Sequence, residues 1–241
     1  MPDNSYKIEH LKKSFQSSKN GQMQIFEDLN MEIEKGKITA VLGPSGCGKS
    51  TLLAILAGFE GYESGNVPEN KNMGVVFQTP ALFPWLTVEE NIAYGLKRHG
   101  IKKTERRKQI EKYLKLVQLN EYAGLYPREL SGGMQQRAAL ARTLVLHPEV
   151  LLMDEPFSAL DPKLKSQMQK LTLQLWKELE QTIFLVTHDV EEALILADTI
   201  YVMQECPAGV HKKIQVPWKE KNDEIRTTKE FFDLKNSLLN N

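Results

Sequence analysis

The amino-acid sequence predicts an α/β protein whose main sheet is largely parallel. Five short segments consist mostly of Val, Ile, Leu and Met, a composition typical of parallel strands that are covered on both faces. Segments with apolar residues at helical spacing lie between them, and this alternation favours right-handed crossovers. With 241 residues, 41% of them hydrophobic and 26% charged, the chain can bury a large core without disulfides, which excludes a disordered polymer.

The N-terminal stretch has a different pattern. Residues 6–9, 23–26 and 29–33 are short apolar runs interleaved with polar residues. Such alternation predicts a small antiparallel sheet with one face toward water. The buried strands of the parallel sheet are expected at residues 38–42, 74–77, 150–153, 183–186 and 200–203.

Three segments carry apolar residues at helical spacing, at 110–117, 134–145 and 164–179, and core packing explains all three. The range 79–130 is mostly helical in character and predicts an inserted helical subdomain. We expect one domain over residues 1–241, with a core formed by 1–78 and 131–205, the helical subdomain at 79–130, and a C-terminal tail at 206–241.

Composition argues against several classes of function. The 31 Lys and Arg residues balance 31 Asp and Glu residues, so a nucleic-acid binder that relies on a strongly basic field is disfavoured. The cysteines, Cys47 and Cys206, lie in no CxxC or Cys/His cluster, which argues against a disulfide scaffold or a zinc module. Neither a signal peptide nor a run of 18 apolar residues occurs, so we expect a cytoplasmic protein that other subunits would hold at any membrane.

A glycine-rich turn links a predicted strand to a predicted helix at 51–57 and matches the pattern G-x-x-x-x-G-K-[ST]. Glycines let backbone N–H groups turn inward around phosphate oxygens, and the helix directs its positive end at the same anion. Lys49 would reach the β- and γ-phosphates, and Ser50 would offer its hydroxyl oxygen to Mg²⁺. The motif predicts a nucleoside triphosphate site formed by Gly43, Pro44, Ser45, Gly46, Cys47, Gly48, Lys49, Ser50 and Thr51.

Cys47 lies inside this turn, where a small filler residue explains it better than a redox role. Its place beside a helix N-terminus nevertheless favours the thiolate. We therefore expect alkylation of Cys47 to inhibit the protein and bound ATP to protect it.

Two adjacent carboxylates, Asp154 and Glu155, end an apolar strand. The strand places Asp154 at the carboxyl edge of the sheet beside the glycine-rich turn, where it can hold Mg²⁺ through water. Glu155 points elsewhere and could polarise an attacking water molecule.

A second small anion-binding turn lies between these motifs, in the segment Leu130-Ser-Gly-Gly-Met-Gln-Gln-Arg137. One chain then carries one more phosphate-binding turn than a single ATP needs. A head-to-tail pair of subunits resolves this, with each nucleotide held by the glycine-rich turn of one subunit and the Ser-Gly-Gly turn of the other.

Six motifs in order resemble the ATP-binding subunit of ABC transporters, over about residues 6–203. They are the P-loop at 43–50, Gln78 after a strand, the signature at 130–135, the strand at 150–155, the segment 158–161, and His188. Together they are far more specific than any one of them.

The resemblance implies a role for each matching residue, with ATP and Mg²⁺ as cofactors. It implies that Phe15 stacks on adenine, although an ordinary strand aromatic would also fit, and that Gln78 contacts Mg²⁺ and the attacking water. Glu155 would be the general base, and His188 would contact the γ-phosphate. Residues expected to meet the nucleotide of the partner subunit are Ser131, Gly132, Gly133 and Asp161.

The stretch 77–86 is rich in Pro and large apolar residues, among them Phe83 and Trp85. It serves either as subdomain core or as a groove for a short helix of a membrane partner. Together with Tyr126-Pro-Arg-Glu129 it resembles importers of nitrate, sulfonate, taurine and related solutes. The resemblance implies permease subunits, a second ATPase subunit, a separate solute-binding protein, and a peripheral place on the cytoplasmic face of the membrane, without nucleic acid.

Two other classes of protein fit this sequence less well. A soluble ABC-type ATPase that acts on nucleic acid or ribosomes tends to carry paired ATPase domains or a long coiled coil, which this length and pattern do not fit. A kinase or GTPase would leave the signature unexplained, and the stretch 70–73 lacks the Asp that guanine recognition needs. The segment 64–74 is shorter than the family's usual hairpin and predicts a trimmed sheet edge, while the tail, with Phe231, Leu234 and Leu238 on one helical face, has no assigned role.

Overall fold

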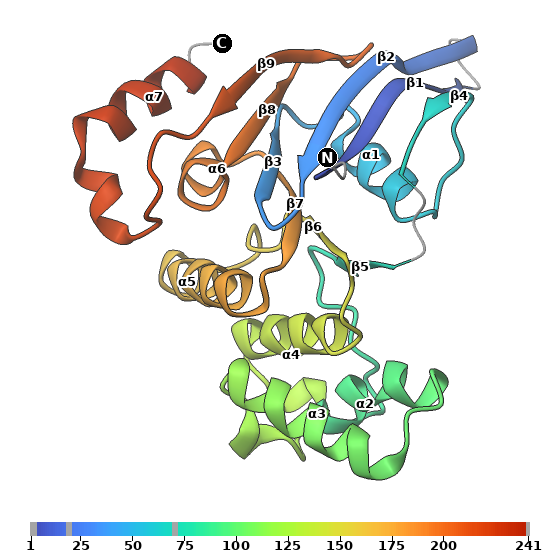
Figure 1. The fold of residues 1–241 in the computed structure, drawn as a ribbon, viewed down its shortest axis with the longest axis vertical. Helices are drawn as coiled ribbons and strands as arrows, with labels where there is room; N and C mark the ends of the chain where they lie inside the picture. Colours follow the sequence, from blue (N-terminus) through green and yellow to red (C-terminus); the bar gives the residue numbers. More distant parts are fainter. Residues whose placement is uncertain (1–3, 18–20, 69–71, 240–241) are drawn as a thin grey trace.

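The computed structural model describes residues 4–17, 21–68 and 72–239. Two β-sheets and several helices make up this part of the chain (Figure 1). The strands of the N-terminal sheet are β1 (Ser5–Ser17), β2 (Gly21–Glu34) and β4 (Ser64–Asn66). The strands of the larger sheet are β3 (Ile38–Leu42), β5 (Met73–Val76), β6 (Val150–Asp154), β7 (Thr182–Thr187), β8 (Thr199–Met203) and β9 (Val210–Gln215).

The larger sheet has the order β5-β6-β7-β3-β8-β9, and all of its pairings are parallel except that of β8 with β9. The five buried strands predicted from the sequence lie here. Strand β9 was not predicted, because its central residues are His and Lys, as an edge strand in contact with water allows. The prediction of a mainly parallel α/β fold is therefore confirmed.

The N-terminal sheet is antiparallel, with the order β2-β1-β4. The expectation of three short strands here is wrong, because residues 23–26 and 29–33 belong to the single long strand β2. Register shifts between Ile8 and Ser14 of β1 interrupt the alternation that the sequence pattern relied on. Strand β4 has only three residues, so the sheet edge is short.

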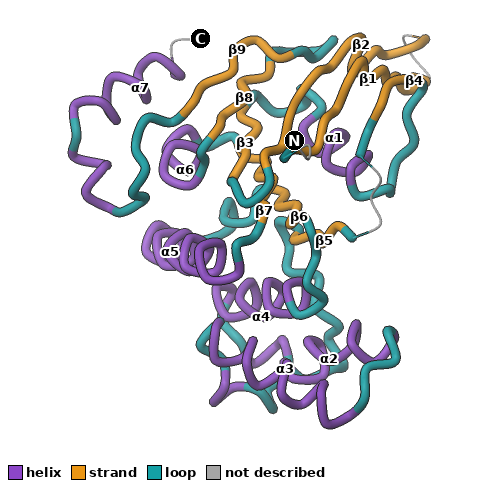
Figure 2. Tube along the Cα trace, viewed as in Figure 1, coloured by secondary structure: helices purple, strands orange, loops and turns teal. Residues whose placement is uncertain are grey.

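The helices are α1 (Lys49–Leu56), α2 (Val88–Arg98), α3 (Lys103–Leu116), α4 (Gly132–Leu144), α5 (Pro162–Leu179), α6 (Val190–Leu196) and α7 (Lys229–Leu239), with 3₁₀ turns η1 (Asn120–Tyr122), η2 (Pro127–Glu129) and η3 (Asp223–Thr227). Helices α2, α3 and α4 gather at the end of the molecule opposite the N-terminal sheet (Figure 2). Residues 79–130 contain α2, α3 and two 3₁₀ turns but no strand. Because α4 packs on α2 and α3 as well as on α5, the boundary at residue 130 stays a prediction.

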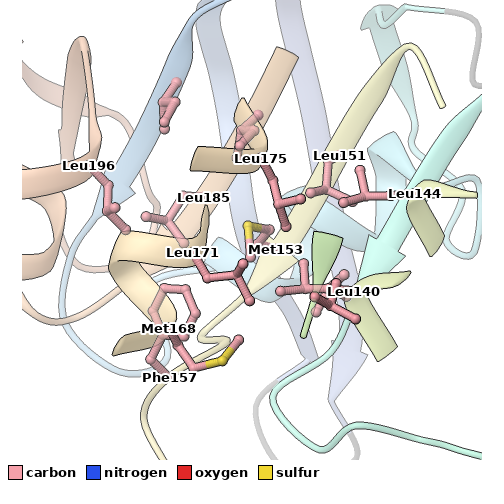
Figure 3. Close-up of a cluster of buried hydrophobic side chains, with 14 of the residues drawn as sticks. Leu140, Leu144, Leu151, Met153, Phe157, Met168, Leu171, Leu175, Leu185 and Leu196 are labelled. Carbon is pink, nitrogen blue, oxygen red and sulfur yellow. The ribbon is translucent and has the colours of Figure 1, made fainter. Parts of the chain in front are cut away.

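Alternate residues of the parallel strands point to opposite faces of the sheet and build two cores. Leu151 and Met153 of β6 point to the face of the sheet that is covered by helices, where they join one cluster with residues of α4 and α5, as Figure 3 shows. Val150 and Leu152 of the same strand face α1 and the N-terminal sheet. The sheet is therefore covered on both sides, which is why its strands consist of continuous apolar runs. None of the helices in the described ranges combines the length and apolar character that a membrane crossing requires.

The C-terminal tail folds back onto the core. Helix α7 was predicted from its apolar face, and its residues Phe231 and Leu238 are buried against α6. Lys221 lies with only 3% of its side chain exposed, 2.9 Å from Asp198 and 4.2 Å from the centre of the Trp176 ring. Burial lowers the pKa of Lys221 to about 8, although the Asp198 carboxylate opposes that shift.

This burial predicts a pH dependence of stability. The unfolded chain keeps the proton on Lys221 up to about pH 10.5, while the folded chain releases it near pH 8, so the unfolding free energy contributed by this residue rises across that window. Between pH 8 and 9.5 the unfolding free energy of the natural protein should rise by about 2 kcal/mol relative to Lys221→Met. Urea unfolding at several pH values measures the difference. The exposed Lys177→Met on α5 serves as control and should follow the natural protein, and equal pH slopes for all three proteins would contradict the prediction.

Candidate functional site

The turn at residues 43–50 leaves the central strand β3 and enters α1. Gly46 and Gly48 adopt left-handed backbone angles, with φ of 83° and 94°. A Cβ atom on Gly48 would come within 2.8 Å of Ile25 and 2.9 Å of Phe26, so the turn lies directly against β2. The glycine at position 48 is therefore required both by conformation and by space.

A cavity of about 320 Å³ opens beside this turn. The Lys49 Nζ atom donates hydrogen bonds to the carbonyl oxygens of Gly43 at 2.8 Å and Pro44 at 2.7 Å, which hold the ammonium group at the loop. The cavity brings together residues from three separate predicted motifs. Its lining consists of Ile25, Ser45, Gly46, Gly48, Lys49, Ser50, Thr51, Gln78, Asp154 and Glu155.

Two side chains whose oxygen atoms could bind a metal ion lie close together in the cavity. The Ser50 hydroxyl donates to the Asp154 carboxylate across 3.2 Å, although the two residues are 104 positions apart in the sequence. Burial raises the pKa of Asp154 above its ordinary value and the Glu155 charge adds to this, while the Ser50 hydrogen bond and Lys49 oppose it. A partly buried carboxylate beside a hydroxyl fits Mg²⁺, which takes one or two protein oxygens and completes its shell with phosphate and water. The described residues contain no group of three or more His, Cys, Asp or Glu side chains that could hold a metal ion by themselves.

Glu155 has a different environment from its neighbour Asp154. Its backbone lies in the left-handed region, with φ of 44°, and its N–H donates to the carbonyl of Val186 on β7. The Glu155 Oε2 atom is 3.1 Å from Nδ1 of His188, which follows β7. A carboxylate that a histidine orients at the rim of a phosphate site can polarise water.

The signature residues lie elsewhere. Ser131 caps α4 through the N–H of Met134, and Ser131 and Gly133 line a separate cavity of about 300 Å³. Asp161 caps α5 by accepting from the N–H groups of Lys163 and Leu164. None of the signature residues, nor Asp161, lines the cavity beside the P-loop.

Two predicted nucleotide contacts, Cys47 and Phe15, do not line this cavity. Cys47 is buried, and loss of solvent raises the pKa of its thiol, with Lys49 opposing the shift. The expectation of a favoured thiolate is therefore wrong, because desolvation outweighs the helix N-terminus. Phe15 is exposed on β1 and does not line the cavity, although it pairs with Met23, two residues before Ile25 on β2. The Lys13 ammonium lies 4.4 Å from the centre of the Phe15 ring, a contact that no local motif signals.

The parallel sheet, the glycine-rich turn and the cavity at its mouth define a P-loop nucleotide-binding protein. Residues 26–158 match the protein-family model described as ABC transporter. The chain belongs to the ABC transporter family, binds ATP, and is an ATP-hydrolysing subunit of this kind of transporter.

Relatives cover nearly the whole chain. The taurine import ATP-binding protein TauB of Pelagibacter ubique is 41% identical, covering 96% of this chain and 92% of the relative. The nitrate import ATP-binding protein NrtD of Synechocystis is 42% identical, covering 89% of this chain and 86% of the relative. A solved dimer of the ATP-binding cassette MJ0796, in a post-hydrolysis state with ADP and Pi, is 29% identical and covers 88% of this chain and 99% of its own, with a TM-score of 0.76.

The position of Gly48 generates a test. Gly48→Ala forces a Cβ atom against Ile25 and Phe26 in a left-handed conformation, so the turn must shift and ATP binding should weaken by more than tenfold. Titration with a fluorescent ATP analogue measures this. Gly100→Ala is the matched control, because Gly100 also has a positive φ, of 71°, but open space around its Cβ position. That variant should lose about 1 kcal/mol of unfolding free energy and keep its affinity. Equal ATP affinity in Gly48→Ala and the natural protein would contradict the prediction.

Proposed function

We propose that this chain energises a permease that imports a small anionic or organic solute such as nitrate, a sulfonate or taurine, and that two copies act together. The observation that carries the proposal is that its two phosphate-binding turns line different cavities. The P-loop lines one cavity, while Ser131 and Gly133 line another. The Ser-Gly-Gly turn can then serve a nucleotide only across a subunit interface, and the dimeric ATP-binding cassette at TM-score 0.76 supports such a pairing.

The residues of the cavity divide the work of hydrolysis. The P-loop amides and Lys49 would hold the phosphates, while Ser50, Asp154 and Gln78 would hold Mg²⁺. When bound, Mg²⁺ would neutralise part of the charge on the β- and γ-phosphates. Glu155 would polarise the attacking water, and His188, at 3.1 Å, would orient that carboxylate and reach toward the γ-phosphate. Phe15 would stack on adenine at the outer end of the site.

An exposed group of aromatic residues supports docking of a membrane partner. Trp85 is 69% exposed, and its ring lies 5.7 Å from that of Phe83, which in turn lies 4.5 Å from that of Tyr94. Phe77, which directly precedes Gln78, stacks with the exposed Phe59 at 6.3 Å. Exposed aromatic groups of this kind are typical of binding surfaces. We name Phe83, Trp85 and Tyr94 the aromatic surface.

Buried hydrogen bonds hold the loop that carries Trp85. Asn91 of α2 is fully buried, and its side chain accepts from the N–H of Phe83 and donates to the carbonyls of Phe83, Leu86 and Thr87. The loop is thus a rigid platform on which a short permease helix can rest. A movement of that helix would reach the cavity through Phe77 and Gln78.

Relatives named for taurine and nitrate import support the solute class. Such an importer also needs a separate solute-binding protein, and this subunit would sit peripherally on the cytoplasmic face of the membrane. Affinity purification from gently solubilised membranes tests the assembly. A stoichiometric polytopic membrane protein would support it. Ribosomal proteins or nucleic acid would instead favour the alternative, a soluble ABC-type ATPase.

Glu155→Gln keeps the shape of the side chain but cannot accept a proton. We expect it to bind ATP with unchanged affinity, to hydrolyse it at least 100-fold more slowly, and to accumulate as an ATP-bound dimer. Phosphate release and size-exclusion chromatography with ATP measure both effects. Glu178→Gln, at an exposed position of α5, is the control and should match the natural protein. Unchanged turnover in Glu155→Gln would remove Glu155 from the proposed role.

Trp85→Ala tests the aromatic surface. Removing an exposed aromatic anchor should weaken association with the permease by at least tenfold while the ATPase rate of the isolated chain stays within twofold. Co-purification from membranes and a phosphate-release assay measure the two properties. Phe232→Ala on α7 removes a ring that is 51% exposed and should leave both unchanged. Full recovery of the permease with Trp85→Ala would refute the docking site.

A further inference from the structure

A partly buried ion-pair cluster connects the first turn of α5 to the residue that follows His188. The Lys165 Nζ atom lies 2.7 Å from Asp189 Oδ2 and 3.0 Å from Glu192 Oε2. The Glu192 side chain is only 2% exposed, so its charge depends on Lys165. Burial alone would lower the pKa of Lys165, but the Asp189 hydrogen bond and the charges of both carboxylates hold it above its ordinary value.

Each end of this cluster is fixed to a part of the candidate site. At one end, the N–H of Lys165 donates to the carbonyl of Asp161, and the Asp161 side chain caps the same turn. At the other end, Asp189 caps α6 by accepting from the N–H of Glu192, and its own N–H donates to the Thr187 hydroxyl on β7. His188 lies in the sequence between Thr187 and Asp189, and its Nδ1 atom is 3.1 Å from Glu155 Oε2.

We infer that Lys165 is a positioning residue for hydrolysis. Its ion pairs with Asp189 and Glu192 fix the position of residues 187–189, which include His188, relative to the first turn of α5. The inference rests on the proposed roles of Glu155 and His188. If the partner subunit displaced residues 158–161, Lys165 would pass that displacement to residues 187–189, which carry the His188 side chain beside Glu155. Lys165 itself would touch neither nucleotide nor water.

Three variants separate positioning from folding. Lys165→Met removes both ion pairs but leaves the buried Glu192 carboxylate without a cation, which threatens the fold. Asp189→Asn keeps an equally good helix cap and leaves the pair between Lys165 and Glu192, so it isolates the tie to residue 189. Lys165→Arg restores a cation in the same place. Lys177→Met, at an exposed position of the same helix, is the control.

The expected result is a loss in kcat without a loss in binding. Lys165→Met and Asp189→Asn should each lower the kcat for ATP about tenfold, because a small displacement of a catalytic group has effects of this order or larger. The Kd for a fluorescent ATP analogue should stay within twofold, and Lys165→Arg should recover at least half of the rate. Because both variants break the same ion pair between Lys165 and Asp189, the double variant should be no slower than the slower single variant.

Other outcomes overturn the inference. If Lys165→Met folds and its kcat is unchanged, the inference is wrong. If Lys165→Met does not fold, an unchanged kcat in Asp189→Asn overturns the inference instead. Losses that multiply in the double variant, or a loss of ATP binding that parallels the loss of kcat, would also contradict it. Glu155→Gln is measured alongside to separate the two proposals. If it is as fast as the natural protein, the proposed function itself fails. If it is inactive while the Lys165 and Asp189 variants are unaffected, only the positioning role is lost.

Discussion

The whole site depends on one constraint: parallel strands deliver their carboxyl ends to a single edge of the sheet. Strands β3, β7 and β6 are neighbours in this order, and each ends in a different part of the cavity or its rim. The turn after β3 holds Lys49 and Ser50, β6 ends in Asp154 and Glu155, and β7 leads into His188. The contact of Ser50 with Asp154 and that of Glu155 with His188 both follow from this arrangement.

Much of this architecture could be predicted because burial on both faces leaves a strong local signal. The strands from β3 to β8 of the larger sheet show it, as do the apolar stripes of α3, α4 and α5. Strand β9 shows none because it is an edge strand, and the shifts of register in β1 disturb the alternation that marks a strand. Sequence patterns therefore locate elements well where both faces are covered and poorly where water meets one side.

The candidate site divides in the same way. The P-loop, Asp154 and Gln78 were predicted from motifs, and they line one cavity. The burial of Cys47, the ring contact of Lys13 with Phe15, and the cluster around Lys165 were not predicted. The burial of Cys47 and the cluster around Lys165 arise between segments that only the fold brings together, and no local spacing reports such contacts. Gly43 shows the same limit, since its Cβ position would lie 3.0 Å from the carbonyl oxygen of Met203 on β8.

A single chain accounts for the fold but, in the proposed pairing, for only part of each nucleotide site. Its larger sheet is covered on both faces, capping residues begin α4 and α5, and α7 packs against α6. Yet Ser131 and Gly133 sit at the N-terminus of α4, facing a cavity that shares no residue with the P-loop cavity. A helix N-terminus favours an anion. In the proposed pairing, the residues that complete the site would come from a second subunit, so that ATP would join the two subunits and its hydrolysis would let them separate.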